Sequence, residues 1–218
     1  MWNTIFDRLN AMDHSLMLML NYDGGIVQDK IWWAMSSKLM WILPVMLFLL
    51  YVYRKYNCRD AVAIIMCLAL TVVLCDQISS SWIKPAVMRL RPSHDTAIQS
   101  ALHYIGDYRG GLYGFVSSHA ANAFGAVVFV SMIVRRKSIT IILMLFAASV
   151  GYSRIYLGVH YPGDVVCGAI LGMAIGKGMY VVCYLRNMIW QRSVFRIVLY
   201  RYAVSILCMI KTLLCIKP

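Results

Sequence analysis

The sequence has 218 residues, of which 61% are hydrophobic and only 14% are charged. Soluble domains average roughly 45–50% apolar and about 25% charged residues, so this composition excludes an ordinary soluble enzyme and indicates an integral membrane protein. Basic residues number 21 against 9 acidic ones, a net charge of +12. In a membrane protein, the distribution of such positive charge among the loops indicates which loops lie in the cytoplasm. We therefore expect no nucleic-acid partner.

The N-terminal segment mixes apolar and polar residues at helical spacing. Residues 1–22 are expected to form an amphipathic helix on the membrane surface. Its apolar face would consist of Ile5, Leu9, Met12, Leu16, Met19 and Leu20. No basic region followed by an apolar core and a small-residue cleavage site is present, so we expect no cleaved signal peptide.

Two apolar runs follow, separated by a short basic loop. The first span is expected over residues 39–53, or alternatively from Ile31 onward, with Pro44 as a kink. The loop at 54–60 carries three basic residues and one acidic residue. The second span is expected over residues 61–83, where a Lys-Pro pair ends it.

A long polar segment divides these spans from the rest of the chain. Residues 84–117 contain no apolar run long enough to cross a bilayer, so they are expected to form an extramembrane loop. A third span is expected over 119–134, followed by a tight basic turn at 135–137. The fourth span would run to Tyr156, and the fifth over 164–185.

The C-terminal tail, residues 193–216, is apolar but interrupted by Arg196, Arg201 and Lys211. It is either a sixth span or an interfacial helix. A mid-membrane Arg costs about 2.5–3.5 kcal/mol on insertion scales, which favours the interfacial helix.

The expected fold is therefore an all-α polytopic membrane helical bundle. It would comprise an N-terminal amphipathic surface helix (1–30), a membrane-embedded domain with five transmembrane helices (31–192) and a C-terminal tail helix (193–218). The basic loops at 54–60 and 135–137 predict cytoplasmic ends, because positive residues stay inside. The ends at residues 84, 118, 157 and 164 then lie outside. We expect a multi-pass protein of a bacterial-type inner membrane with these ends facing the periplasm.

Residues 153–164 place a cation, an imidazole and a carboxylate between two apolar runs, an arrangement that is costly at a membrane. Pro162 fits only the first turn of the following helix. Asp164 would lie near that helix N-terminus and accept a hydrogen bond from one ring nitrogen of His160. The other nitrogen would remain free as a base or nucleophile. The structural alternative is a buried histidine satisfied by a local aspartate.

Two other stretches meet this one at the same membrane face. Lys84 and Arg91 are seven residues apart, about two helical turns, so they are expected on one helical face. Ser117 and Ser118 open the third span, where a serine caps the helix and free backbone N–H groups form an anion site. With Arg154, three long cations would converge on one anion.

Phosphate is the anion that this set of groups suits best. Arginine forks bind non-bridging oxygens, and lysine adds a point charge. His160 can attack phosphorus, while His119 can protonate the leaving oxygen and later activate water. A zinc site on the same histidines is disfavoured, since three cations would repel the metal. The 7 cysteines show no CxxC spacing, so we expect neither a structural metal nor a cofactor.

Three motifs in order resemble those of a known family. K-x6-R-P at 84–92, Ser-Ser-His at 117–119 and S-R-x5-H-x3-D at 153–164 are similar to the signature motifs of the type 2 phosphatidic acid phosphatase (PAP2) family, which shares a helical core with vanadium haloperoxidases. The resemblance covers about residues 60–185.

The resemblance implies metal-free hydrolysis of a lipid phosphate, with His160 as nucleophile, Asp164 as its partner and His119 as the acid. It also implies that five residues hold the phosphate: Lys84, Arg91, Arg154, Ser117 and Ser118. One departure concerns the usual P-S-G-H, which here reads Val-Ser-Ser-His. Ser118 thus adds a side chain where the family backbone approaches the phosphate.

Some residues outside the motifs have simpler interpretations. Asp76 is interpreted as a structural ion-pair partner of Lys84 or Arg89, and Arg89 alternatively as a side chain that reaches lipid headgroups. Four glycines lie close to small-xxx-small spacing, which favours tight helix packing: Gly168, Gly172, Gly176 and Gly178.

The expected partners are the lipid bilayer and a lipid phosphate substrate. Undecaprenyl diphosphate and a lipid A phosphate are the substrates that we expect first. A phosphatidylglycerophosphate or phosphatidate phosphatase is the alternative, because the motifs recognise the phosphate and not the lipid. A membrane transporter of an anionic substrate belongs to a different class. It is disfavoured because the charges gather at one face and no inverted repeat is visible. The oligomeric state stays open.

Overall fold

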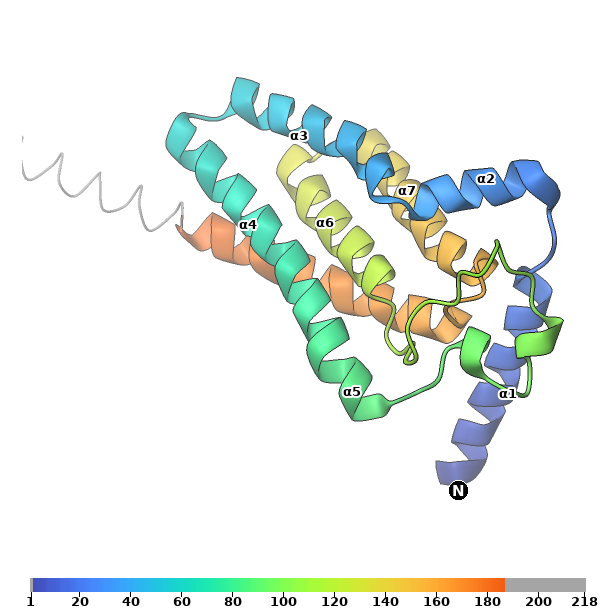
Figure 1. Cartoon of the computed structure of the whole chain (residues 1–218). Coiled ribbons are helices and arrows are strands. Elements are labelled where there is room, and N and C mark those ends of the chain that lie inside the picture. Colours follow the sequence, from blue (N-terminus) through green and yellow to red (C-terminus); the bar gives the residue numbers. More distant parts are fainter. Residues whose placement is uncertain (1, 187–218) are drawn as a thin grey trace, which may run out of the picture. The chain divides into compact units, whose positions relative to one another are not determined.

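A computed structural model describes residues 2–186, and its regular structure is helical (Figure 1). In chain order the helices are α1 (Trp2–Leu20), α2 (Gly25–Ser36), η1 (Lys38–Trp41), α3 (Ile42–Lys55), α4 (Cys58–Gln77), η2 (Ile78–Ile83), α5 (Lys84–Val87), η3 (Pro92–His94), η4 (Gln99–Ala101), α6 (Ser118–Val134), α7 (Lys137–Tyr156) and a last helix, Pro162–Arg186. Within residues 2–186 the only β-type pairing is one isolated bridge, Leu90 with Tyr113. The expected all-α fold is confirmed.

The chain forms two compact units, Met1–Tyr180 and Val181–Pro218. The first unit contains all the elements treated below. Of the second, the structure describes only the end of the last helix, and the tail at 193–216 lies outside the described residues.

Helices lie at all five positions where spans are expected. Three are long and apolar enough to cross a membrane: Cys58–Val87, Lys137–Tyr156 and Pro162–Arg186. A fourth crossing results if Gly25–Ser36 and Lys38–Lys55 act as one broken span. With 17 residues, α6 is apolar but shorter. Length alone therefore supports three or four crossings.

The first expected span bends at Ser37 instead of at Pro44. Ser37 has extended backbone angles, φ −79° and ψ 154°, and the helices on its two sides differ in direction by 60°. Pro44 is the third residue of α3. Because η1 runs directly into α3, Lys38–Lys55 is one continuous helix, and the 60° bend lies before it.

The second span continues past its expected end. A π-helical turn, η2, joins α4 to α5, and Pro85 lies in the first turn of α5. Met88, in a left-handed conformation with φ 51°, then ends the helix. Arg91 follows in extended backbone, so the prediction that Lys84 and Arg91 share a helical face is wrong.

Tight packing of small residues joins the last helix to α6. Three glycines, four residues apart, face α6: Gly168, Gly172 and Gly176. A Cβ atom at these positions would collide with backbone oxygens of α6 and its cap, those of Ser117, Ala121 and Gly125 respectively. The predicted close packing is thus confirmed for these three, whereas an added Cβ at Gly178 meets no atom within 4 Å.

Helix α1 is amphipathic, but its polar face contacts protein. Asp13, Met17 and Asn21, spaced by four residues, are buried. The Asn21 amide donates to the backbone oxygen of Tyr156 at 2.7 Å. Its large exposed apolar side chains include Leu9, Met12, Leu16 and Met19, and Asp7, Arg8 and Asn10 are exposed as well. The face with Asp13, Met17 and Asn21 thus binds the rest of the domain, and the position of α1 on the membrane surface stays a prediction.

The two ends of α6 differ in character. Arg135, directly after the helix, donates to the Tyr180 hydroxyl at 2.6 Å. Lys55 and Arg136 are close enough to interact electrostatically, which brings both basic loops to this end. Ser118 begins α6 at the opposite end, where the motifs meet.

Candidate active site

The turn after α7 places His160 in the interior. The helix ends at Tyr156, and Gly158 adopts φ 72°, a left-handed conformation that suits glycine. The His160 N–H then donates to the Arg154 oxygen at 3.3 Å. As a result His160 is 1% exposed, and Asp164, in the first turn of the last helix, is 0% exposed.

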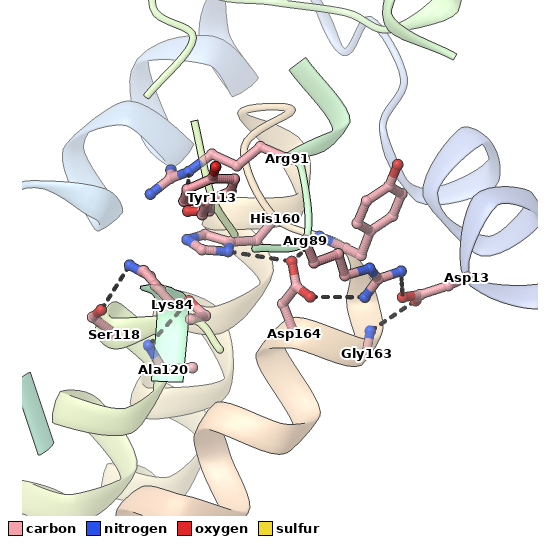
Figure 2. Close-up of polar contacts among 12 residues, drawn as sticks. Asp13, Lys84, Arg89, Arg91, Tyr113, Ser118, Ala120, His160, Gly163 and Asp164 are labelled. Atoms are coloured by element: carbon pink, nitrogen blue, oxygen red, sulfur yellow. Dashed lines mark hydrogen bonds and ion pairs between the residues drawn. The ribbon is translucent and has the colours of Figure 1, made fainter. Parts of the chain in front are cut away.

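The imidazole of His160 faces the carboxylate of Asp164 (Figure 2). Nδ1 lies 3.5 Å from Oδ2 of Asp164, beyond the roughly 2.7–3.2 Å of a full N–H···O hydrogen bond. Among the described residues Nδ1 has no other partner. Burial, and then the charges of Arg91 and Arg154, lower the pKa of His160 well below its ordinary value. The ring is therefore neutral near pH 7, with a lone pair available for attack.

Asp164 is held on several sides. Its Oδ2 accepts from the Tyr161 N–H at 3.1 Å, and its Oδ1 accepts from Nη1 of Arg89 at 2.8 Å. Its backbone oxygen accepts from the Ser117 N–H at 3.0 Å, which joins the last helix to the start of α6. The carboxylate is thus fixed before any substrate arrives.

Arg154 has two of its donors occupied by residues of other segments. Nη1 donates to the Ser36 hydroxyl at the end of α2, and Nη2 donates to the Tyr108 hydroxyl of the outer loop at 2.8 Å. Tyr108 in turn packs edge-on against Trp33, with ring centroids 5.4 Å apart. Nε of Arg154 is buried without a hydrogen-bond partner, so its N–H is available to an anion.

Lys84 reaches the serine that departs from the family pattern. Its Nζ donates to Oγ of Ser118 at 2.9 Å (Figure 2). Ser80, in the π-helical turn, shares a 2.9 Å hydrogen bond with the same Oγ. Such turns are frequent at functional sites, and this one brings Ser80 and Lys84 to the same hydroxyl. The additional side chain of Ser118 thus anchors the lysine ammonium.

Arg91 lies against two glycines. Its Nε donates to the Tyr113 oxygen at 3.1 Å. A side chain on Gly110, which has φ 68°, would collide with Nη1 of Arg91. A Cβ on Gly114 would lie 2.8 Å from Oδ2 of Asp164. The loop can therefore approach both charged groups only with glycine at these positions.

His119 lies at the first turn of α6, directly after the cap. Ser117 is the N-cap, and its hydroxyl accepts from the Ala120 N–H at 3.5 Å. The His119 side chain is exposed, yet it interacts electrostatically with His160 and Arg154. An exposed imidazole beside the buried one can exchange protons with water.

The structure thus gathers the eight predicted residues at one end of the helices: Lys84, Arg91, Ser117, Ser118, His119, Arg154, His160 and Asp164. Their roles stay predictions.

Other residues of the site were missed. Arg89 pairs with Asp13 and Asp164, so its assignments to Asp76 or to lipid headgroups are wrong. Within residues 2–186, Asp76 has no ion-pair contact within 4.0 Å, but its charge acts on Lys84, the other partner named for it. A sign was present for Asp13, an acid four residues before Met17 in the more apolar second half of α1. No comparable sequence pattern identifies Ser36 or Tyr108.

A separate group of possible metal ligands lies outside the phosphate site. One atom from each of Asp23, Asp29 and His103 falls within 4.8 Å of the others. Oδ1 of Asp29 already accepts from the Tyr156 hydroxyl at 2.7 Å and lies 2.9 Å from Nε2 of His103. These contacts join α2, the loop at 84–117 and α7.

Comparisons with known proteins agree with the motifs. Residues 60–189 match the PAP2 superfamily. A lipid A 4'-phosphatase of Bacteroides thetaiotaomicron is 35% identical over 178 residues, 81% of this chain and 79% of that protein. A lipid A 4'-phosphatase of Porphyromonas gingivalis is 35% identical over 171 residues, 78% of this chain and 72% of that protein.

Solved structures share the fold. A transmembrane PAP2 type phosphatidylglycerolphosphate phosphatase from Bacillus subtilis has a TM-score of 0.61 and 16% identity, over 79% of this chain and 84% of that one. Aquifex aeolicus LpxE has a TM-score of 0.54 and 22% identity, over 76% and 92% respectively. The resemblance inferred from the motifs is confirmed: the chain belongs to the PAP2 superfamily.

Proposed function

We propose that this protein hydrolyses the 4'-phosphate of lipid A at the outer face of the cytoplasmic membrane. The family and the curated relatives make it a membrane lipid phosphate phosphatase, a phosphoric ester hydrolase. The choice of lipid A is supported by two relatives of that name, each 35% identical.

The observation that carries the mechanism is the convergence of three cations on a buried, neutral histidine. The charges of Lys84, Arg91 and Arg154 all act on His160. Together they would neutralise the non-bridging oxygens of a phosphate and stabilise the charge that builds in the transition state. Because the protein's own cations supply this charge, we expect turnover in the presence of a chelator.

In the first step Nε2 of His160 attacks phosphorus, and the bond from phosphorus to the lipid oxygen breaks. The negative charge of the bound phosphate favours the protonated form of His119, which donates its proton to that oxygen, so the lipid leaves as an alcohol. Asp164, facing Nδ1, stabilises the positive charge that the ring acquires. The product of this step is a phosphohistidine.

In the second step His119, now neutral, takes a proton from a water molecule as its oxygen attacks phosphorus. The bond from phosphorus to Nε2 breaks, and inorganic phosphate leaves. His160 is returned neutral and His119 protonated, so both groups are ready for another cycle. The exposure of His119 suits this exchange with water.

The test is phosphate release by the purified protein, with EDTA present, from a panel of lipids. The panel contains bisphosphorylated lipid A, undecaprenyl diphosphate, phosphatidylglycerophosphate and phosphatidate. We expect the fastest release from lipid A, and mass spectrometry should place the remaining phosphate at position 1. Preference for another lipid would refute the substrate, and activity that disappears in EDTA and returns with a divalent metal would refute the mechanism.

A further inference from the structure

We propose that Arg89 and Asp13 are positioning residues for the catalytic pair, so that the N-terminal helix α1 is part of the catalytic apparatus. This inference rests on the proposed function, because it concerns how Asp164 orients His160. Neither residue belongs to the catalytic or phosphate-binding groups assigned above.

Arg89 joins two carboxylates through one guanidinium group (Figure 2). Its Nη1 donates to Oδ1 of Asp164 at 2.8 Å, and its Nη2 donates to Oδ2 of Asp13 at 2.7 Å. The guanidinium carbon lies 4.2 Å from the centre of the Tyr161 ring. A planar, permanently charged fork in such a setting has little freedom to rotate.

Asp13 completes the link to α1. It is 8% exposed, and its second oxygen accepts from the Gly163 N–H at 2.8 Å. Asp13 therefore contacts both the arginine that holds Asp164 and the backbone directly before Asp164. The Asp13 carboxylate also compensates the charge of the Arg89 guanidinium. Without Asp13, this partly buried cation would have Asp164 as its only ion-pair partner.

The geometry explains why Asp164 needs this support. A carboxylate at the end of an aspartate side chain rotates about a broad χ2 torsion. The Tyr161 N–H anchors Oδ2, and Arg89 anchors Oδ1, so the two contacts together fix the plane of the group. That plane determines whether Oδ2 faces Nδ1 of His160, 3.5 Å away. Without Arg89 the Asp164 carboxylate could rotate, while the phosphate-binding cations would keep their positions.

The contacts of α1 indicate that it packs in one defined position against the rest of the first unit. Met17 is fully buried and packs with Ile98, Leu102 and Tyr161 of the outer segments. The helix thus lies against the turn that carries His160, with Asp13 toward the site.

The test compares Asp13→Asn and Arg89→Gln with the wild-type protein and with Asp7→Asn. Asp7 is the matched control, an aspartate of the same helix that is exposed. For each variant kcat and KM are measured on lipid A and on para-nitrophenyl phosphate, and the inhibition constant of inorganic phosphate reports the anion site. Groups that orient others in an active site typically contribute roughly 10–100-fold.

We expect kcat to fall about 10-fold in Asp13→Asn and about 100-fold in Arg89→Gln, with KM and the phosphate inhibition constant changed less than about two-fold. Asp7→Asn should match wild type. Guanidinium chloride at millimolar concentration should partly restore Arg89→Ala but not Asp164→Ala. Unchanged kcat in Asp13→Asn, or phosphate inhibition that weakens in parallel with kcat, would overturn the proposal.

A double-mutant cycle separates coupling from simple addition. Since Asp13 acts through Arg89, the double variant should be no slower than Arg89→Gln alone. Multiplied losses would overturn the proposed order. If wild type cleaves para-nitrophenyl phosphate but not lipid A, the substrate proposal fails, and the positioning proposal is still decided on the soluble substrate.

Discussion

The two histidines of the site differ in their exposure, and this difference supports the roles that we propose for them. His160 is buried, faces a fixed carboxylate and carries a lowered pKa, which suits a neutral nucleophile. His119 is exposed at the start of α6, where water can reach it, which suits a group that gives and takes protons.

The expected effects of the two alanine variants therefore depend on the leaving group. His160→Ala removes the nucleophile, so neither a lipid phosphate nor an acidic phenyl phosphate should be turned over. His119→Ala removes the proton donor, which typically contributes about 10²–10⁴-fold when the leaving oxygen needs protonation. An acidic phenol leaves without protonation, so its release should survive far better than that of lipid alcohol.

A label experiment checks the same assignment. If His119 also activates water, His119→Ala should accumulate acid-labile phosphate on His160 after incubation with labelled substrate. Equal losses in both variants on both substrates, with no trapped label, would show that the two roles are assigned wrongly.

At the scale of elements, the helices were predictable because each apolar run must satisfy its backbone internally in a membrane. The residues proposed to bind phosphate were predictable because the motifs define them by residue type and spacing. The contacts of Arg89 with Asp13 and Asp164 span 76 and 75 residues, so no local pattern contains them. The helical face assigned to Lys84 and Arg91 failed because a left-handed Met88 ends α5 between them.

The glycines of the last helix give two predictions for the melting temperature, with opposite signs at packed and at exposed positions. In an exposed helix position, Gly→Ala stabilises by roughly 0.5–1 kcal/mol because it lowers backbone entropy in the unfolded chain. Gly178→Ala should therefore leave the melting temperature in detergent unchanged or raised, since no atom lies within 4 Å of its Cβ. Gly172→Ala should lower it, because the new methyl meets the Ala121 oxygen.

The Ala121 oxygen cannot move away cheaply, because it is part of the α6 backbone. Differential scanning fluorimetry on matched detergent preparations gives the comparison. Two variants with the same change in melting temperature would mean that the helices separate there, contrary to the structure.

In the first unit, the basic loops and the candidate active site lie at opposite ends. Basic residues after α3 and α6 lie at one end, while His160 and the outer loop lie at the other. Positive loops remain in the cytoplasm, so the phosphate site should open to the outside. For a lipid substrate this orientation decides which leaflet supplies it.

Cysteine labelling in spheroplasts checks this orientation with an internal control. Gln99 is exposed in the outer segment, and the native Cys58, also exposed, lies beside the basic loop at the opposite end. In the Gln99→Cys variant an impermeant maleimide should label residue 99 before lysis, while Cys58 should react only after lysis. Removing Cys58 by Cys58→Ser identifies which site carries the label. The reverse order of labelling would place the active site in the cytoplasm, and with it the substrate in the inner leaflet.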